Sequence, residues 1–264
     1  MYAFNYQRPH SLQEAASLIQ AGGQALAGGQ TLLASMKLRL SSPESLVDLS
    51  QIHELKEIKM DGQHLVIGAM VKHSQVATDP LVKQHLPALA DLASHIGDKQ
   101  VRAMGTIGGS VANNDPSACY PSAVLALGAN IHTTRRVIAA QDFFQGMFST
   151  ALESGELITA ISFPCPKKAV YLKFKQQASR FALVGIFLAQ MSDGVRVAIT
   201  GASQQGVFRH SGLEAALNKS FTVESAASVH IYETDLNHDI HASAAYRAHM
   251  ISVQAQRAVK HLLG

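Results

Sequence analysis

GTIGGSVANNDPSACYPSAVLALGA, residues 105–129, places three glycines within five residues directly in front of an apolar run. Hydroxyl and amide side chains follow the glycines, and the apolar stretch from Ala123 to Leu127 follows these. Glycine admits backbone conformations closed to other residues and lets another group approach the main chain closely. The stretch therefore predicts a turn with accessible backbone that an apolar segment anchors in the core.

A second segment of similar composition lies near the start of the chain, AGGQT at residues 27–31. Consecutive backbone N–H groups in such a turn suit phosphate oxygens, and a helix that starts there adds a favourable potential. The hydroxyls of Thr31, Thr106 and Ser110 add further donors. Most glycine pairs are only tight turns, so each segment alone favours a structural role. Together they predict the two halves of a diphosphate clamp.

The usual motifs for phosphate-rich ligands and for hydrolysis are absent. No G-x-G-x-x-G follows the first expected strand, and no G-x-x-x-x-G-K-[ST] occurs. H-E-x-x-H and G-x-S-x-G are also missing. These absences leave open a phosphate-rich cofactor that is bound through a different kind of motif.

Composition narrows the class of protein further. With 264 residues, 47% hydrophobic and 16% charged, the chain is long and apolar enough for two or three compact units. Its net charge of +3 is spread along the sequence without a dense basic block, which argues against nucleic-acid binding. We expect neither a secretory signal nor a membrane span, because no suitable apolar run occurs. Cys119 and Cys165 are the only cysteines, and two cysteines cannot hold an iron–sulfur cluster. Such a low number of cysteines also predicts a cytoplasmic protein without structural disulfides.

Periodicity indicates a small α/β unit in the first 50 residues. Ser11 with Glu14 predicts a capping box for a helix that ends at Gly22 and Gly23. The other expected elements of this unit are strands at 2–6, 24–28 and 46–50 and a helix near 32–36. Further along we expect a hairpin around Asp61 and Gly62, a helical region over 81–96 and a strand at ELITAISFP. The prolines at 164 and 166 predict a boundary before a separate α+β unit.

Several stretches, in this order along nearly the whole chain, resemble the FAD-binding (medium) subunit of molybdenum hydroxylases, the carbon monoxide dehydrogenase and xanthine dehydrogenase family. These stretches are AGGQTLLASMKLRL, VIGAM, KQVRAMGTIGGSVANNDP, RRVIAAQDFFQGMF, ELITAISFP, RVAITGA and AYRAHM. The resemblance implies an α+β protein with a two-subdomain FAD-binding fold of the vanillyl-alcohol-oxidase type and a smaller C-terminal α+β domain. The implied boundaries are 1–54, 55–165 and 166–264.

The resemblance also implies which residues bind FAD. Those expected at the diphosphate are Ala27, Gly28, Gly29, Gln30, Thr31, Thr106, Ile107, Gly108, Gly109 and Ser110. Ile96 and Phe181 would lie by the isoalloxazine ring, Lys175 near the cofactor and Ile158 on the adenine side. An ordinary core or surface position stays open for each of these four residues. No catalytic side chain and no metal ligand is expected, since the flavin supplies the redox chemistry.

The sequence departs from the family pattern at three positions. Cys119 stands where relatives often carry an aspartate after D-P, and Arg180 precedes Phe181 where an acidic residue is common. Ser110 replaces the asparagine of the usual T-I-G-G-N and still offers a hydrogen-bond donor. Local charge tunes a flavin, so the first two changes bear on its potential.

The implied function is electron transfer inside a heteromeric molybdenum hydroxylase. Electrons would pass from a small two-cluster iron–sulfur subunit through FAD on this chain to an acceptor, while a large molybdenum-cofactor subunit hydroxylates the substrate. A dimer of heterotrimers is the implied assembly. Two other readings remain: a self-contained FAD-dependent oxidase of the same superfamily, and a binding module without flavin. Both glycine segments are intact, which argues against the module.

Overall fold

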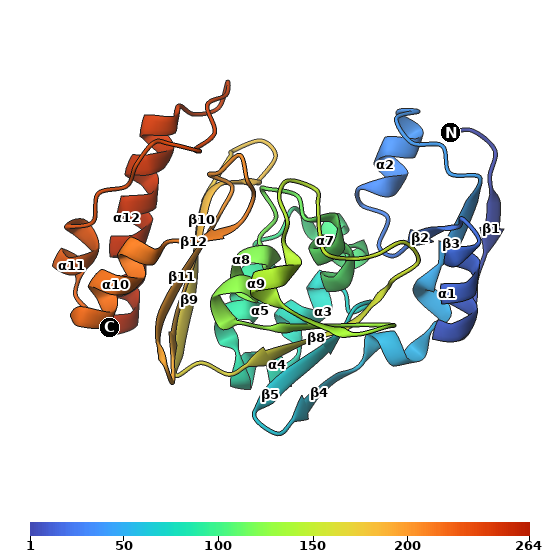
Figure 1. Ribbon diagram of the computed structural model, residues 1–264, viewed down its shortest axis with the longest axis horizontal. Helices are drawn as coiled ribbons and strands as arrows, with labels where there is room; N and C mark the ends of the chain where they lie inside the picture. Colours follow the sequence, from blue (N-terminus) through green and yellow to red (C-terminus); the bar gives the residue numbers. More distant parts are fainter.

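The computed structural model describes residues 1–264 and contains three separate β-sheets. They follow one another along the sequence, and Figure 1 shows them side by side from the N-terminal unit to the C-terminal unit. Helices cover the sheets, which confirms an α+β fold. The domain boundaries at 54/55 and 165/166 stay a prediction. None of the helices combines the length and apolar character needed to cross a bilayer.

The first sheet is small and parallel, with strand order β1-β3-β2. Its elements are β1 (Asn5–Gln7), α1 (Leu12–Gln20), β2 (Gln24–Leu26), α2 (Leu32–Lys37) and β3 (Ser45–Asp48). Ser11 caps α1 by accepting from the backbone N–H of Glu14, as predicted. The Glu14 carboxylate reaches the N–H of His10 instead of that of Ser11. The first strand begins three residues later than predicted, at Asn5.

The second sheet has five antiparallel strands in the order β4-β5-β8-β6-β7. The strands are β4 (Ile58–Asp61), β5 (His64–Gly68), β6 (Asn130–Thr133), β7 (Val137–Ala139) and β8 (Ile158–Pro164). The hairpin predicted around Asp61 and Gly62 joins β4 to β5. Before β4, Leu55 lies in a short 3-10 helix, His53–Lys56.

Seven helices accompany the second sheet. Most of them form a layer on the side of this sheet that faces the units of the first and third sheets (Figure 1). They are α3 (His73–Thr78), α4 (Pro80–His85), α5 (Pro87–Ser94), α6 (Lys99–Met104), α7 (Ile107–Asn113), α8 (Tyr120–Leu127) and α9 (Ala140–Phe143). The opening stretch of sequence supplies α7 and α8. The residues of α8 are almost all buried, so the expected apolar anchor behind the glycine turn is present.

The third sheet is antiparallel with order β12-β11-β10-β9 and lies between two layers of helices. Its elements are β9 (Lys168–Lys175), β10 (Ala182–Met191), β11 (Gly194–Thr200), β12 (Phe208–Arg209), α10 (Ser211–Lys219), α11 (Val223–Ala227) and α12 (Ala244–Leu263). Along β10, Ile186 and Leu188 belong to the C-terminal core, whereas Phe187 and Ala189 join the central core. Burial on both faces explains why β10 reads as a continuous apolar run.

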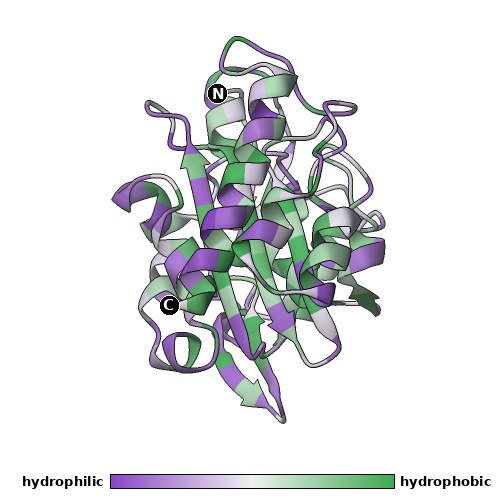
Figure 2. Cartoon of the chain, turned by 90° about the vertical axis from the view of Figure 1, so that its left-hand side faces the viewer, coloured by the Kyte–Doolittle hydropathy of each residue, from purple (hydrophilic) through white to green (hydrophobic).

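Figure 2 turns this C-terminal unit toward the viewer, and its helices alternate between hydrophilic and hydrophobic residues. The side of α12 that carries Ile251, Ala255, Ala258 and Val259 is buried against the sheet. The amphipathic pattern thus accounts for the outer layer of the C-terminal unit.

Candidate functional site

A cavity of about 1090 Å³ lies where the three units meet. Its lining runs from Ile19 at the end of α1 to Phe181 just before β10. Pockets for small ligands and cofactors typically have about 300–1,000 Å³. The cavity is therefore large enough for an extended cofactor, and several stretches of chain far apart in sequence build it.

The first glycine segment, residues 27–31, crosses the middle of this lining between β2 and α2. Gly29 has φ of +70°, a left-handed conformation that glycine adopts without strain. The backbone N–H groups of residues 28–31 donate no hydrogen bond within the chain. Thr31 precedes α2, and its hydroxyl caps no backbone group. Four consecutive free donors at the start of a helix suit an anionic ligand such as a diphosphate.

The second glycine segment, residues 106–110, differs in how its backbone donors are used. Thr106 caps α7, and its Oγ1 accepts from Gly109 N at 3.2 Å. The N–H groups of Ile107, Gly108 and Ser110 donate to the carbonyls of Val71, Ala69 and Thr106. Because these donors are already satisfied, what this segment can offer a ligand is the hydroxyl groups of Thr106 and Ser110, two residues of the cavity lining.

The glycines also bring the two segments into contact with each other. A Cβ on Gly28 would lie 2.3 Å from the carbonyl oxygen of Met104, and one on Gly109 would lie 3.5 Å from Ala27 Cβ. A Cβ on Gly108 would lie 2.5 Å from Ala69 Cβ. Gly28 and Gly108 need glycine for this close packing, whereas the contact of Gly109 with Ala27 is an ordinary van der Waals distance. The packing holds the free donors of the first segment next to the hydroxyls of the second.

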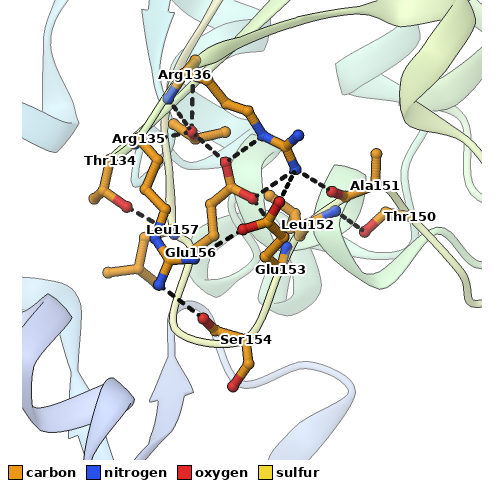
Figure 3. A network of polar contacts seen from close by, with 11 residues as sticks. Thr134, Arg135, Arg136, Thr150, Ala151, Leu152, Glu153, Ser154, Glu156 and Leu157 are labelled. Carbon is orange, nitrogen blue, oxygen red and sulfur yellow. Dashed lines mark hydrogen bonds and ion pairs between the residues drawn. The ribbon is translucent and has the colours of Figure 1, made fainter.

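One end of the cavity is formed by Ile158 and the segment 154–157 together with Gly22 and Gly23. A polar network fixes this segment (Figure 3). Arg136 binds both carboxylate oxygens of Glu156 at 3.1 Å, and Glu156 accepts in addition from Glu153 N and Thr133 Oγ1. These hydrogen bonds outweigh the effect of burial and hold the pKa of Glu156 at about 2. Arg135 supports the same segment through the carbonyl of Ser154, at 2.9 Å.

The other end contains Ile96 and Phe181, with Cys119 and Lys173 beside them in the lining. Ile96 lies in the short link between α5 and α6, and the carbonyls of residues 95–97 accept from three cations. Lys173 Nζ donates to His95 O at 3.0 Å, Arg102 Nη1 to Ile96 O at 3.0 Å, and Arg180 Nη1 to Gly97 O at 3.4 Å. Two of these cations come from the C-terminal unit, which is thereby tied to the loop that carries Ile96.

His73 is a second titratable side chain in the lining whose pKa is strongly shifted. It is 5% exposed, packs on the Tyr120 ring and leaves its Nδ1 without a partner. Burial lowers the pKa of His73 from 6.5 to about 4, and Arg102 adds to this effect. The imidazole is therefore neutral at physiological pH and contributes no charge to the cavity.

Twelve of the fourteen residues predicted to bind a cofactor line this one cavity: Ala27, Gly28, Gly29, Gln30, Thr31, Ile96, Thr106, Gly108, Gly109, Ser110, Ile158 and Phe181. The structure does not bring the other two to it. Ile107 is fully buried in the central core. Lys175 lines a separate, smaller pocket with Phe174 and Tyr246.

Sequence reasoning did not select Lys173, Glu156, His73 or Asn113, which also line the cavity. The strand VYLKFK offered two lysines, at 173 and 175, and the register of β9 decides between them. That register shifts opposite Phe174 and Lys175, where β10 skips from Ala182 to Val184. Such a bulge re-aims the side chains that follow it, and no periodicity in the sequence marks it.

Comparison with known proteins identifies relatives over almost the whole chain. Residues 2–166 match the family model described as the FAD binding domain in molybdopterin dehydrogenase. The carbon monoxide dehydrogenase medium chain of Hydrogenophaga pseudoflava is 34% identical over 274 residues, 97% of this chain and 96% of that one. The glyceraldehyde dehydrogenase medium chain of Sulfolobus acidocaldarius is 32% identical over 97% of both chains.

Solved structures agree with these matches. Carbon monoxide dehydrogenase from Hydrogenophaga pseudoflava superposes with a TM-score of 0.92 at 33% identity, covering 99% of this chain and 98% of that one. Quinoline 2-oxidoreductase from Pseudomonas putida 86 gives a TM-score of 0.91 at 30% identity, covering 99% and 97%. The likeness extends through all three units, including the C-terminal one.

Proposed function

Because the chain belongs to the family of FAD-binding domains of molybdopterin dehydrogenases, its cofactor is FAD, and we propose that it is the electron-transfer subunit of a heteromeric molybdenum hydroxylase. Relatives along its full length are medium chains of dehydrogenases, so the chain is a flavoprotein subunit of an oxidoreductase. The positions proposed for the parts of FAD rest on the residues that line the cavity.

The observation that carries the proposal is the row of free backbone donors at residues 28–31 inside the cavity. Gly28 is buried and Gly29 is half-buried, and buried N–H groups nearly always find a partner, so their free donors indicate a ligand. The N–H groups of the exposed Gln30 and Thr31 extend the same row and suit a ligand rich in acceptor oxygens. The diphosphate of FAD supplies such oxygens. Gly29 shapes the turn, and the hydroxyls of Thr31, Thr106 and Ser110 complete the site.

The rest of the cofactor follows the cavity in both directions from this point. The adenine part lies toward Ile158 and the braced segment 154–157, and the isoalloxazine part lies between Ile96 and Phe181. Phe181 is 57% exposed, so this end of the cavity opens to solvent, where an acceptor has access. The side chains bind and orient the cofactor and shield it from water, and none of them acts as nucleophile or base.

Bound FAD supplies the redox chemistry by accepting electrons and passing them on. With Cys119 and Cys165 far apart in sequence, the iron–sulfur clusters belong to another chain. We therefore propose a small two-cluster iron–sulfur subunit and a large molybdenum-cofactor subunit as partners in a dimer of heterotrimers. The assembly is cytoplasmic, and this chain alone has little activity.

Two preparations test the proposal: the chain purified alone, and the chain purified after co-expression with its neighbouring genes. We expect a flavin spectrum in both, with iron–sulfur absorption and molybdenum only after co-expression. Co-purification of FAD without any metal-containing partner, together with substrate oxidation by the chain alone, would overturn the subunit assignment in favour of a self-contained oxidase.

A further inference from the structure

Lys173 is a cation in the cavity lining that no carboxylate neutralises. Its Nζ donates to His95 O at 3.0 Å and to Cys119 Sγ at 3.3 Å, and it forms no ion pair. An ammonium group has three donors, so one N–H of Lys173 remains for the cavity. The two fixed contacts hold the ammonium at the end of the cavity that contains Ile96.

The surroundings of Lys173 restrict how its charge is compensated. Asp98 and Asp115 line the same cavity, but neither forms an ion pair with Lys173; Asp98 accepts from Val101 N at the start of α6, and Asp115 accepts from Ser117 N. Arg180 is also present at this end and adds a second positive charge. A thiol at 119 is a weak acceptor, in contrast to a carboxylate at the same place, which would carry a full negative charge.

We infer that Lys173 is the residue that lies against the isoalloxazine end of the cofactor, and that Cys119 leaves its charge free to stabilise the reduced flavin. This inference rests on the proposed FAD site. Reduction places negative charge on the ring system, and a nearby cation in a partly buried site favours that charge. Lys173 acts as a positioning and tuning residue, with Cys119 setting how much of its charge the flavin experiences.

Sulfite binding to the full-length, FAD-loaded chain tests this without any turnover. Sulfite adds to the oxidised flavin ring and leaves negative charge on it, so its dissociation constant reports on nearby positive charge. The variants are Lys173→Met, Cys119→Asp and Cys119→Ser, and Lys219→Met removes an exposed lysine of the same unit as a matched control. Absorption titration gives the dissociation constants, and a redox titration gives the midpoint potential.

We expect Lys173→Met and Cys119→Asp each to weaken sulfite binding about tenfold, which corresponds to a lower potential by about 30 mV for a two-electron couple. Cys119→Ser and Lys219→Met are expected to stay within about twofold of wild type, well under the 1.4 kcal/mol of a tenfold change. If Lys173→Met does not fold, Cys119→Asp alone carries the test.

Unchanged sulfite affinity in both Lys173→Met and Cys119→Asp would overturn the inference. Tenfold tighter binding in Cys119→Ser would also overturn it, because it would show that Cys119 carries negative charge and already neutralises Lys173. A wild-type chain that holds no FAD would instead refute the proposed function, so the two failures are distinguishable.

Discussion

Gly28 and Gly108 lie where two stretches of backbone pack closely against each other. Each faces main-chain atoms of a segment far away in sequence, Met104–Gly105 for Gly28 and Ala69 for Gly108. A single methyl group at either position requires the segments to move apart. The arrangement of the free donors at residues 28–31, which include the N–H of Gly28 itself, therefore depends on close packing that only glycine permits.

Replacing Gly108 with alanine is expected to destabilise the protein by about 1–3 kcal/mol, the usual effect of overpacking. The new methyl would approach Ala69 Cβ to 2.5 Å and its carbonyl oxygen to 2.7 Å. Gly212, in the first turn of α10, is the matched control, since its new methyl would meet only side-chain atoms at 3.3 Å or more. Urea unfolding should find Gly212→Ala neutral or up to about 1 kcal/mol more stable. Equal effects of the two substitutions would contradict this account.

His73 makes stability depend on pH in a defined window. Its pKa is about 4 in the folded chain and 6.5 ordinarily, so the unfolded chain binds the proton more readily. The stability present above pH 6.5 is lost as the pH falls toward 4, by about 2 kcal/mol between pH 7 and 5. His73→Leu should remove this part of the pH dependence, measured as the difference in unfolding free energy at the two pH values. An unchanged difference would show that His73 is protonated or accessible in the folded protein.

The segment 153–157 is an element without regular structure that nevertheless forms a wall of the cavity. Figure 3 shows why it is ordered: the Glu156 carboxylate, with 0% of its side chain exposed, accepts from Arg136 and from the backbone of Glu153. Thr133 Oγ1 donates to the same carboxylate. Removing the charge leaves those donors without a full partner.

Glu156→Gln is expected to cost about 2 kcal/mol of stability, in the range for hydrogen bonds to charged groups, and to speed amide exchange in residues 153–157. The exposed pair Lys59–Glu57 supplies the control, Glu57→Gln, with an effect of about 0–1 kcal/mol. The difference between wild type and Glu156→Gln should be constant above pH 4.5, because the pKa of Glu156 is about 2, and should shrink as the pH falls from 4.5 toward 2. A pH-independent difference down to pH 2 would refute the assigned role.

At the level of elements, the sequence predicts best where local rules decide. The helix after Ser11 and the hairpin at Asp61 and Gly62 follow from capping and turn chemistry. The start of β1 depends on pairing with β3, a contact over some 40 residues that local patterns do not contain. The bulge in β10 opposite Lys175 is likewise a tertiary feature.

The cavity itself belongs to the whole molecule, since its walls come from all three units. Sequence patterns alone indicated two glycine segments, and the family resemblance added Ile96, Ile158 and Phe181, which the structure gathers with them. The comparisons confirm that resemblance. The sequence did not predict two features of the site. The backbone N–H groups of the first segment are free, whereas those of the second segment donate within the chain. Lys173, and not Lys175, lines the cavity.

The central and C-terminal units share a hydrophobic core. Tyr171, Phe187 and Met191 of the third sheet pack in one cluster with Tyr120 and Leu127 of α8. A chain that ends at residue 165 would expose that face of α8. We expect it to associate or to bind hydrophobic dyes, in contrast to the full chain, as size-exclusion chromatography and dye fluorescence can measure. A monomeric, dye-free product would show that residues 1–165 form an independent domain.

The central claim is that the free donors at residues 28–31 hold the diphosphate of FAD. The most direct test is the flavin content of the purified full-length chain and of two valine variants at left-handed glycines. Gly29 (φ +70°) lines the cavity and Gly62 (φ +56°) lies in the β4–β5 turn, so Gly29→Val and Gly62→Val carry similar backbone strain. We predict one FAD per chain in wild type and Gly62→Val, and a folded chain without FAD for Gly29→Val. A full complement of FAD in Gly29→Val, or none in the folded wild type, would contradict the account.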